Sequence, residues 1–97
     1  MHTNGPPSHG SIVAAAILFE GKVYSEPPPA RHHTLLRIIA EELRVAGRPV
    51  IIRNEEQGFL TSLGKFVRRK PAAWIAQEAG QITEPKWGDQ LYSEDLW

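Results

Sequence analysis

A chain of 97 residues is the usual size of one domain and leaves little room for a second. It contains no cysteine, which excludes disulfide bonds, thiolate zinc sites and cysteine nucleophiles and favours an intracellular location. Lys plus Arg balance Asp plus Glu at 11 each, and this zero net charge argues against a general DNA or RNA binder. No apolar run approaches the roughly 20 residues that a membrane helix requires, so no membrane partner is expected.

The charges are distributed unevenly along the chain. Residues 31–70 contain nine Lys and Arg side chains against four Glu side chains, a net of +5, so the remainder carries −5. This asymmetry predicts either a local anion site in the middle of the chain with an acidic tail packed elsewhere, or simply a mixed, solvated surface.

The first quarter of the chain predicts a flexible arm and a β-hairpin. Residues 1–11 are rich in turn-forming residues and predict a flexible N-terminal arm, which leaves residues 12–97 as a single domain. Residues 12–19 are apolar on both faces, which predicts a strand central in a sheet or buried at an interface. A Glu-Gly turn then leads into a second strand at residues 22–25.

A stiff polyproline connector is expected at residues 26–30, followed by an amphipathic helix over residues 34–46. Thr34 is the predicted N-cap, and Gly47 the predicted terminator. The stripe expected to face the core contains Leu35, Leu36, Ile39, Leu43 and Ala46.

The second half predicts three strands and a helix. The strands are expected at residues 49–53, 58–61 and 65–68, and the helix at residues 72–79 with Pro71 in its first turn. The order ββα followed by βββα predicts an α+β fold, in which two helices cover one face of a small antiparallel sheet and a C-terminal tail docks.

Four residues with hydrogen-bond donors stand directly at the start of the first predicted helix: Arg31, His32, His33 and Thr34. The unpaired N–H groups and the dipole of a helix start favour anions, and the guanidinium, imidazole and hydroxyl groups suit a phosphate or pyrophosphate. The alternative is that the basic groups are solvated and that Thr34 only caps the helix.

The two histidines also suggest metal ligands, with an acidic residue of the tail completing the site. Adjacent histidines point in different directions, and no spaced pair such as HExxH is present, so neither a metal nor another cofactor is expected. The acidic residues considered were Asp89, Glu94 and Asp95.

A second candidate site follows the hairpin at residues 57–69, where small hydroxyl residues beside glycines would let a ligand approach the backbone. Phe59 or Phe66 would stack on a base, although the more favoured interpretation places both rings in the core. The candidate ligand-binding residues here are Phe59, Thr61, Ser62, Lys65 and Arg68.

The C-terminal segment, residues 91–97, is dense in aromatic and acidic residues and predicts docking. Trp97 would fill a groove on this or a neighbouring subunit, and Asp95 would lie near a ligand, but a simple structural clasp is somewhat favoured. Trp74 and Trp87 have no predicted role beyond packing. No serine stands in a nucleophile elbow and no histidine has an evident carboxylate partner, so the sequence does not indicate an enzyme.

Three stretches carry a resemblance: AAI…GKVY…RHH within residues 12–33, QGFLTSLGKFV…A..IA.EAGQ at residues 57–81, and LYSEDLW at residues 91–97. Together they resemble a family of short, phage-encoded proteins. That family is similar to the first-described type of Thoeris anti-defence proteins, which sequester signalling nucleotides.

The resemblance implies a non-enzymatic sponge that is a homo-oligomer, from dimer to hexamer, in the cytoplasm of the infected bacterial host. Its ligand would be glycocyclic ADP-ribose or another cyclic ADP-ribose type, with cyclic oligonucleotides at separate sites. Arg31 would bind phosphate beside His32 or His33, while Asp95 would lie near the pocket. The nucleoside would be lined by Phe59, Thr61 and Ser62.

The sequence departs from the pattern at Lys70-Pro71, where a polar or acidic cap is expected, and this leaves the start of the second helix open. Two other functions also remain open. A small hydrolase of cyclic nucleotides would use His32 or His33 as general acid or base. A protein-binding inhibitor or regulator would use the apolar first strand and Trp97 as its contact surface.

Overall fold

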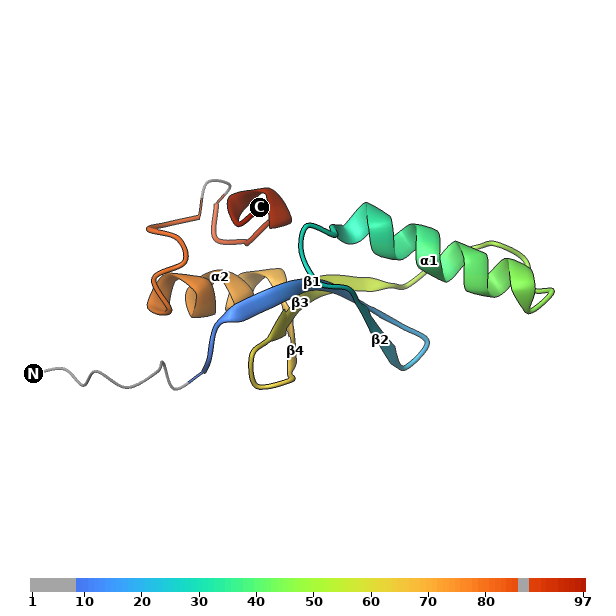
Figure 1. Ribbon diagram of the computed structural model, residues 1–97, viewed down its shortest axis with the longest axis horizontal. Coiled ribbons are helices and arrows are strands. Elements are labelled where there is room, and N and C mark those ends of the chain that lie inside the picture. The colour runs from blue at the N-terminus through green and yellow to red at the C-terminus, as the bar shows by residue number, and fades with distance from the viewer. Residues whose placement is uncertain (1–8, 86–87) are drawn as a thin grey trace, which may run out of the picture.

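The structure is a computed structural model in which residues 9–85 and 88–97 are described. The first hairpin consists of β1 (Ile12–Phe19) and β2 (Lys22–Ser25), and the second of β3 (Glu56–Thr61) and β4 (Phe66–Arg68). All neighbouring strands are antiparallel, and the sheet order is β2-β1-β3-β4 (Figure 1). The predicted arm at residues 1–11 lies mostly outside the described residues, and Trp87 lies outside them entirely.

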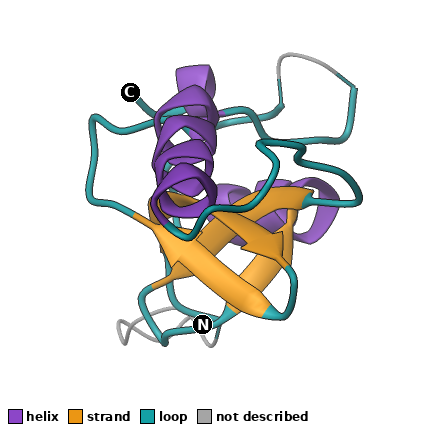
Figure 2. Ribbon diagram, turned by 90° about the vertical axis from the view of Figure 1, so that its right-hand side faces the viewer, coloured by secondary structure: helices purple, strands orange, loops and turns teal. Residues whose placement is uncertain are grey.

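Two helices and a short 3-10 turn complete the domain. Helix α1 (His32–Val45) follows the first hairpin, α2 (Arg69–Glu78) follows the second, and η1 (Ser93–Asp95) lies in the tail. Side chains of both helices pack in one core cluster with the same face of the sheet, and Figure 2 shows α1 above the strands and α2 behind them. This arrangement confirms the predicted α+β fold. None of the described helices is long and apolar enough to cross a membrane.

The strand predicted at residues 49–53 is wrong, because this segment is a loop. Strand β1 already pairs with β2 on one side and with β3 on the other, so the segment finds no free edge beside β1. Two of its apolar side chains are exposed, Val50 at 51% and Ile51 at 53%, while Ile52 packs against the core. The second strand group therefore has two strands, not three.

Helix α1 begins two residues earlier than predicted, because Arg31 and not Thr34 is the N-cap. The Thr34 hydroxyl accepts a hydrogen bond from the Arg31 N–H at 3.3 Å, so Thr34 supports the helix start from within its first turn. Gly47, at φ +73°, ends the helix as predicted, and the Arg48 N–H donates to the Leu43 carbonyl at 2.9 Å. Ala46, predicted to face the core, is exposed, because the helix ends at Val45.

The prediction of an extended polyproline connector at residues 26–30 is also wrong. The Ala30 N–H donates to the Pro27 carbonyl at 3.2 Å, so the segment turns rather than extends. The Pro28–Pro29 peptide bond is cis. The turn brings the chain from the edge strand β2 to the start of α1.

Helix α2 begins at Arg69, three residues earlier than predicted, with Pro71 in its first turn and no acidic residue there. The sequence departs from the family pattern at Lys70-Pro71, and in the structure α2 starts there without an acidic cap. Its buried side chains are Ala72, Ala73, Ile75 and Ala76, while Ala79, predicted to face the sheet, is only partly buried.

The core lies between the two helices and one face of the sheet. β1 contributes Ala15 and Ile17, β3 contributes Phe59, and all three side chains are fully buried. Leu35 and Ile39 of α1 are likewise fully buried in this cluster. Burial of each such large side chain contributes about 1.5–3 kcal/mol, so this layer carries the fold.

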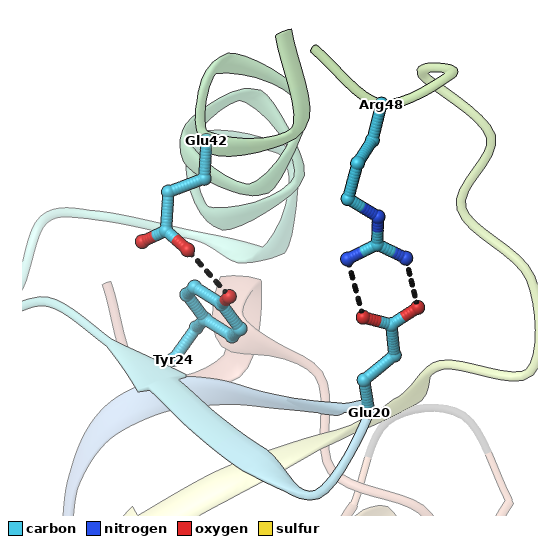
Figure 3. Close-up of polar contacts among 4 residues, drawn as sticks. All are labelled: Glu20, Tyr24, Glu42 and Arg48. Atoms are coloured by element: carbon cyan, nitrogen blue, oxygen red, sulfur yellow. Dashed lines mark hydrogen bonds and ion pairs between the residues drawn. The ribbon is translucent and has the colours of Figure 1, made fainter. Parts of the chain in front are cut away.

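Polar contacts hold α1 to the first hairpin (Figure 3). The Tyr24 hydroxyl donates to Glu42 at 2.8 Å, and the Arg48 guanidinium donates to both carboxylate oxygens of Glu20 at 2.9 and 2.7 Å. Burial and the Glu42 contact raise the pKa of Tyr24, whereas the hydrogen bond from Arg48 lowers the pKa of Glu20. These surface contacts orient the helix more than they stabilise it.

Candidate functional site

The starts of α1 and α2 lie near the middle of the molecule, and the C-terminal tail lies beside them (Figure 1). Leu91 and Arg69 exchange two hydrogen bonds, one between main-chain atoms at 3.0 Å and one from the guanidinium at 2.9 Å. The Trp97 indole N–H donates to the Ala30 carbonyl at 3.0 Å, and the Arg31 guanidinium donates to the main-chain oxygen of Trp97. The tail therefore clasps its own chain, as the structural interpretation of Trp97 predicted.

His32 is buried beneath this clasp. Its Nε2 lies 2.7 Å from the Gly58 carbonyl oxygen, which only accepts, so Nε2 carries the proton. Its Nδ1 then presents a lone pair toward Nη2 of Arg69 at 3.5 Å. Burial lowers the pKa of His32, and the nearby Arg69 charge lowers it further. The imidazole is therefore neutral, and both of its ring nitrogens have partners within the fold, which suits a structural role.

Arg69 connects the two helix starts. Its guanidinium donates to the Gln57 side-chain oxygen at 2.8 Å and lies 4.5 Å from the centre of the Tyr92 ring. No ion pair among the described residues includes Arg69. Because neutral oxygens and aromatic rings surround it, burial lowers its pKa. Its charge is satisfied within the fold.

The donors predicted to bind phosphate at the start of α1 are thus directed toward the chain itself. Arg31 contacts the tail, His32 contacts β3, and the Thr34 hydroxyl caps the helix. His33 is exposed, and its side chain forms no hydrogen bond with the described residues. In the tail, Asp95 accepts the Tyr92 N–H at 2.9 Å, and its second carboxylate oxygen is buried without a partner among the described atoms.

A pocket of about 400 Å³, here called the Trp74 pocket, lies between α2 and the β3–β4 hairpin, and none of its lining residues belongs to the tail. Trp74 is 51% exposed, and the edge of its ring meets His9 with the ring centres 4.9 Å apart. One wall comes from α2 and the other from the β3–β4 hairpin. The lining residues are His9, Thr61, Leu63, Lys65, Val67, Pro71, Trp74 and Ile75.

Two of the predicted hairpin residues, Thr61 and Lys65, line this pocket. The buried Thr61 hydroxyl accepts the N–H groups of Leu63 and Lys65, both at 3.2 Å, and so shapes the turn. The Ser62 hydroxyl accepts the Ser11 N–H at 3.0 Å, which ties the chain before β1 to the same turn. Lys65 is exposed at the rim of the pocket.

The other three hairpin candidates, Ser62, Phe59 and Arg68, do not line the pocket. Phe59 is fully buried in the core, so the favoured core interpretation of this ring is confirmed. Arg68 projects from β4 and forms an ion pair with Glu56 at 2.8 Å. The sequence candidates are therefore divided between the tail clasp, the core, the Trp74 pocket and the exposed surface, where His33 and Arg68 lie.

Sequence reasoning missed Trp74, although a pattern pointed to it. Residue 74 falls outside the stripe that Ala72, Ile75 and Ala76 form on α2, so a large aromatic ring stands at a solvent-facing position of the helix. His9 had no such indication, because its place depends on the path of the chain before β1. The sequence indicates Arg69 as a basic residue near the exit of the hairpin that would neutralise phosphate, and not as the residue that contacts the tail at Leu91.

The Trp74 pocket has two facing walls, which distinguishes it from the larger hollow of about 670 Å³ on the molecule. That hollow is lined only by one side of α1, from Arg37 to Ala46, and so lacks an opposing wall. The described residues contain no group of three or more His, Asp or Glu side chains that would hold a metal ion. An aromatic wall with a lysine at its rim suits a flat ring that carries negative charge.

No curated protein and no solved structure matches the chain. The family described as Phage T4 y16D protein matches residues 11–97, which span the whole sheet, both helices and the tail. This match bears out the phage-encoded family predicted from the sequence motifs, while the likeness to nucleotide sponges stays a prediction. The chain belongs to the Phage T4 y16D protein family.

Proposed function

We propose that the protein binds a small ligand with a flat ring and a phosphate, of the cyclic nucleotide class, in the Trp74 pocket. The observation that carries this proposal is an exposed tryptophan facing a lysine-bearing hairpin across a volume of about 400 Å³. A pocket of this size lies within the usual range for small ligands. A base stacked on an aromatic ring gains about 1–3 kcal/mol, and the Lys65 ammonium attracts phosphate as a point charge.

The ligand would be held intact. The neutral His32 has both ring nitrogens engaged within the fold, which leaves it without a free acid or base function. The Thr61 hydroxyl in the pocket accepts two main-chain N–H groups and lacks a neighbouring general base among its hydrogen-bond partners. These contacts favour a binding protein over a hydrolase.

The proposed biological role is sequestration of a cyclic nucleotide signal of host defence, of the glycocyclic ADP-ribose or cyclic oligonucleotide type, in the cytoplasm of the infected cell. Membership of a phage protein family supports this setting. Effective sequestration requires a Kd near 1 nM, about −12 kcal/mol, which exceeds what Trp74 and Lys65 alone supply. A homo-oligomer, from dimer to hexamer, would provide the additional contacts.

The direct test is calorimetry and thermal shift with a panel of cyclic ADP-ribose isomers and cyclic di- and trinucleotides. Heat-denaturing the complex releases the ligand for chromatography. Tight binding with recovery of the intact ligand is the expected result. Recovery of a cleaved product would assign the protein to the hydrolase class, and absence of binding across the panel would leave a protein-binding inhibitor.

Matched variants locate the site. Trp74→Ala and Lys65→Gln are each expected to weaken binding at least about tenfold, since each removes 1.4 kcal/mol or more of ligand contact. Arg37→Gln, a change of an exposed basic side chain on α1, serves as the control and leaves the affinity unchanged. Loss of binding in Arg31→Ala with retention in Trp74→Ala would instead place the ligand at the start of α1.

A further inference from the structure

Beside its two facing walls, the Trp74 pocket has a third side, which the chain before β1 provides. The Ser62 N–H donates to the Ser11 carbonyl at 2.8 Å, and the Ser11 N–H donates to the Ser62 hydroxyl at 3.0 Å. This reciprocal pair fixes the segment that leads into β1 against the turn of the β3–β4 hairpin. His9, two positions earlier in the chain, is one of the residues that line the pocket.

Gly10 allows this close approach of the chain to the turn. It is buried and has a φ of +75°, a backbone conformation that favours glycine. A Cβ at this position would overlap the Ser62 hydroxyl oxygen and lie 3.1 Å from Cγ of Leu63, so a larger residue would push the chain away from the turn. The backbone at residues 10 and 11 therefore determines where the imidazole of His9 lies.

The imidazole of His9 is available to a ligand. It meets the Trp74 ring edge-on, with the ring centres 4.9 Å apart and the ring planes at 69°. The side chain is exposed, and neither ring nitrogen forms a hydrogen bond with the described residues. His32, by contrast, has partners for both ring nitrogens, and His33 does not line the pocket. Among the described histidines, His9 is therefore the one that can contact a molecule in the Trp74 pocket.

The ionisable groups of the pocket are all basic. His9 and Lys65 are the ionisable side chains among its eight lining residues, and none of the eight is an aspartate or a glutamate. Across the pocket, the hairpin presents Lys65 as its charged side chain, while α2 presents Pro71, Trp74 and Ile75. A ligand in the pocket therefore meets two basic groups and no carboxylate among the lining residues, an arrangement that favours a phosphate over a cation.

We propose that His9 is a second phosphate-binding residue of the Trp74 pocket and that it makes anion binding there dependent on pH. This inference rests on the proposed binding of a phosphate-bearing ligand in the same pocket. Histidine is the side chain whose charge changes between about pH 5 and 8. The protonated imidazole is a cation with two donor nitrogens, whereas the neutral ring has one donor and one acceptor. A phosphodiester keeps its single negative charge throughout this range, so its affinity is expected to rise as the pH falls.

Calorimetry at pH 7.5 and 6.0, with the tightest member of the cyclic nucleotide panel, measures this dependence. The wild type is expected to bind about three- to fivefold more tightly at pH 6.0, the gain typical of one charge contact at an exposed site. His9→Gln retains an N–H donor but cannot gain a charge, so the dependence is expected to disappear. His33→Gln, at an exposed histidine outside the pocket, is the matched control and is expected to keep it. Both variants retain His32, so any effect of pH on the fold is common to them.

A further variant separates a ligand contact from a purely structural wall. His9→Phe keeps an aromatic ring against Trp74 but has no nitrogen to donate a hydrogen bond. It is expected to weaken binding at pH 6.0 by about fivefold, as His9→Gln does. Wild-type affinity in His9→Phe, or wild-type pH dependence in His9→Gln, would overturn the proposal, because the ring would then act only by packing.

An anion without a ring distinguishes this inference from the proposed nucleotide function. Dimethyl phosphate carries one negative charge at both pH values and has no base to stack on Trp74. At millimolar concentration it is expected to shift the NMR signals of the His9 imidazole and the Lys65 side chain, more at pH 6.0 than at pH 7.5, and to leave His33 unchanged. Such shifts without binding of any nucleotide on the panel would support the anion site and contradict the nucleotide function. Absence of a shift at His9 at both pH values would overturn the proposal, whether or not a nucleotide binds.

Discussion

The imidazole of His32 and the guanidinium of Arg69 lie with Nδ1 and Nη2 3.5 Å apart, at the first residue of each helix. His32 joins α1 to β3 through its hydrogen bond to Gly58, and Arg69 joins α2 to the tail through its hydrogen bond to Leu91. Neither helix has an acidic residue in its first turn, so the pair occupies a position where the helix dipole would favour an acid. It therefore links both helices, the sheet and the tail.

The protein is expected to lose stability as the pH falls below about 6.5, the ordinary pKa of histidine. Burial lowers the pKa of His32 in the folded state, so the unfolded chain binds the proton more readily. By linkage, the free energy of unfolding decreases as the pH falls from the unfolded pKa through the folded one. Urea unfolding between pH 7.5 and 5.5 measures this decrease.

His33 provides the control for this pH dependence. His33→Gln, a change at an exposed residue, is expected to retain the decrease, whereas His32→Gln is expected to flatten it. His32→Gln also removes a buried hydrogen bond to Gly58 and should cost about 1–3 kcal/mol at neutral pH. Equal pH profiles for the wild type and His32→Gln would contradict the assignment of a neutral, buried imidazole.

Trp97→Ala is expected to destabilise the fold by about 2–4 kcal/mol. The change removes the indole hydrogen bond to Ala30 and the packing of a half-buried ring against the core. Trp74→Ala, which truncates the same side chain at a position 51% exposed, is expected to cost less than about 1 kcal/mol. Chemical unfolding of both variants tests the clasp, and similar losses for the two would show that the tail contributes no specific stability.

Gly58→Ala is expected to cost about 3 kcal/mol or more, because the added Cβ would overlap the Val67 carbonyl oxygen and lie 2.9 Å from the Phe66 ring. Gly80→Ala is the comparison. Its Cβ would meet nothing within 4 Å, so only the positive φ of +78° opposes it, at about 1–2 kcal/mol. If Gly58→Ala unfolds no more easily than Gly80→Ala, close strand packing at Gly58 is not the constraint.

Local patterns predicted the elements whose causes are local. The Glu-Gly turn, the periodic apolar stripe of α1 and the glycines that end both helices each act over a few residues, and all are present, with Ala46 the exception within the stripe. The strand predicted at residues 49–53 does not form, because a strand requires a pairing partner, and which segments pair is decided by how the whole sheet assembles. Local propensity does not contain that information.

The candidate site was also predicted only in part, because only some of its residues are brought together by local structure. Thr61 and Lys65 lie in the Trp74 pocket because a tight turn places both at the hairpin, which the sequence indicated. The burial of His32 and the clasp between Arg31 and Trp97 join residues 26 and 66 positions apart in the chain. Such pairings depend on how the elements pack, so the donors before α1 looked available for a ligand when considered alone.

The central claim is that a nucleotide binds in the Trp74 pocket, and two-dimensional NMR of the ¹⁵N-labelled chain tests it most directly. Addition of the tightest ligand from the cyclic nucleotide panel is expected to shift the Trp74 indole N–H and the Lys65 amide. The Trp97 indole N–H, which remains bonded to Ala30, is expected to stay in place. Shifts confined to Trp97 and Arg31, or none with any member of the panel, would contradict the account.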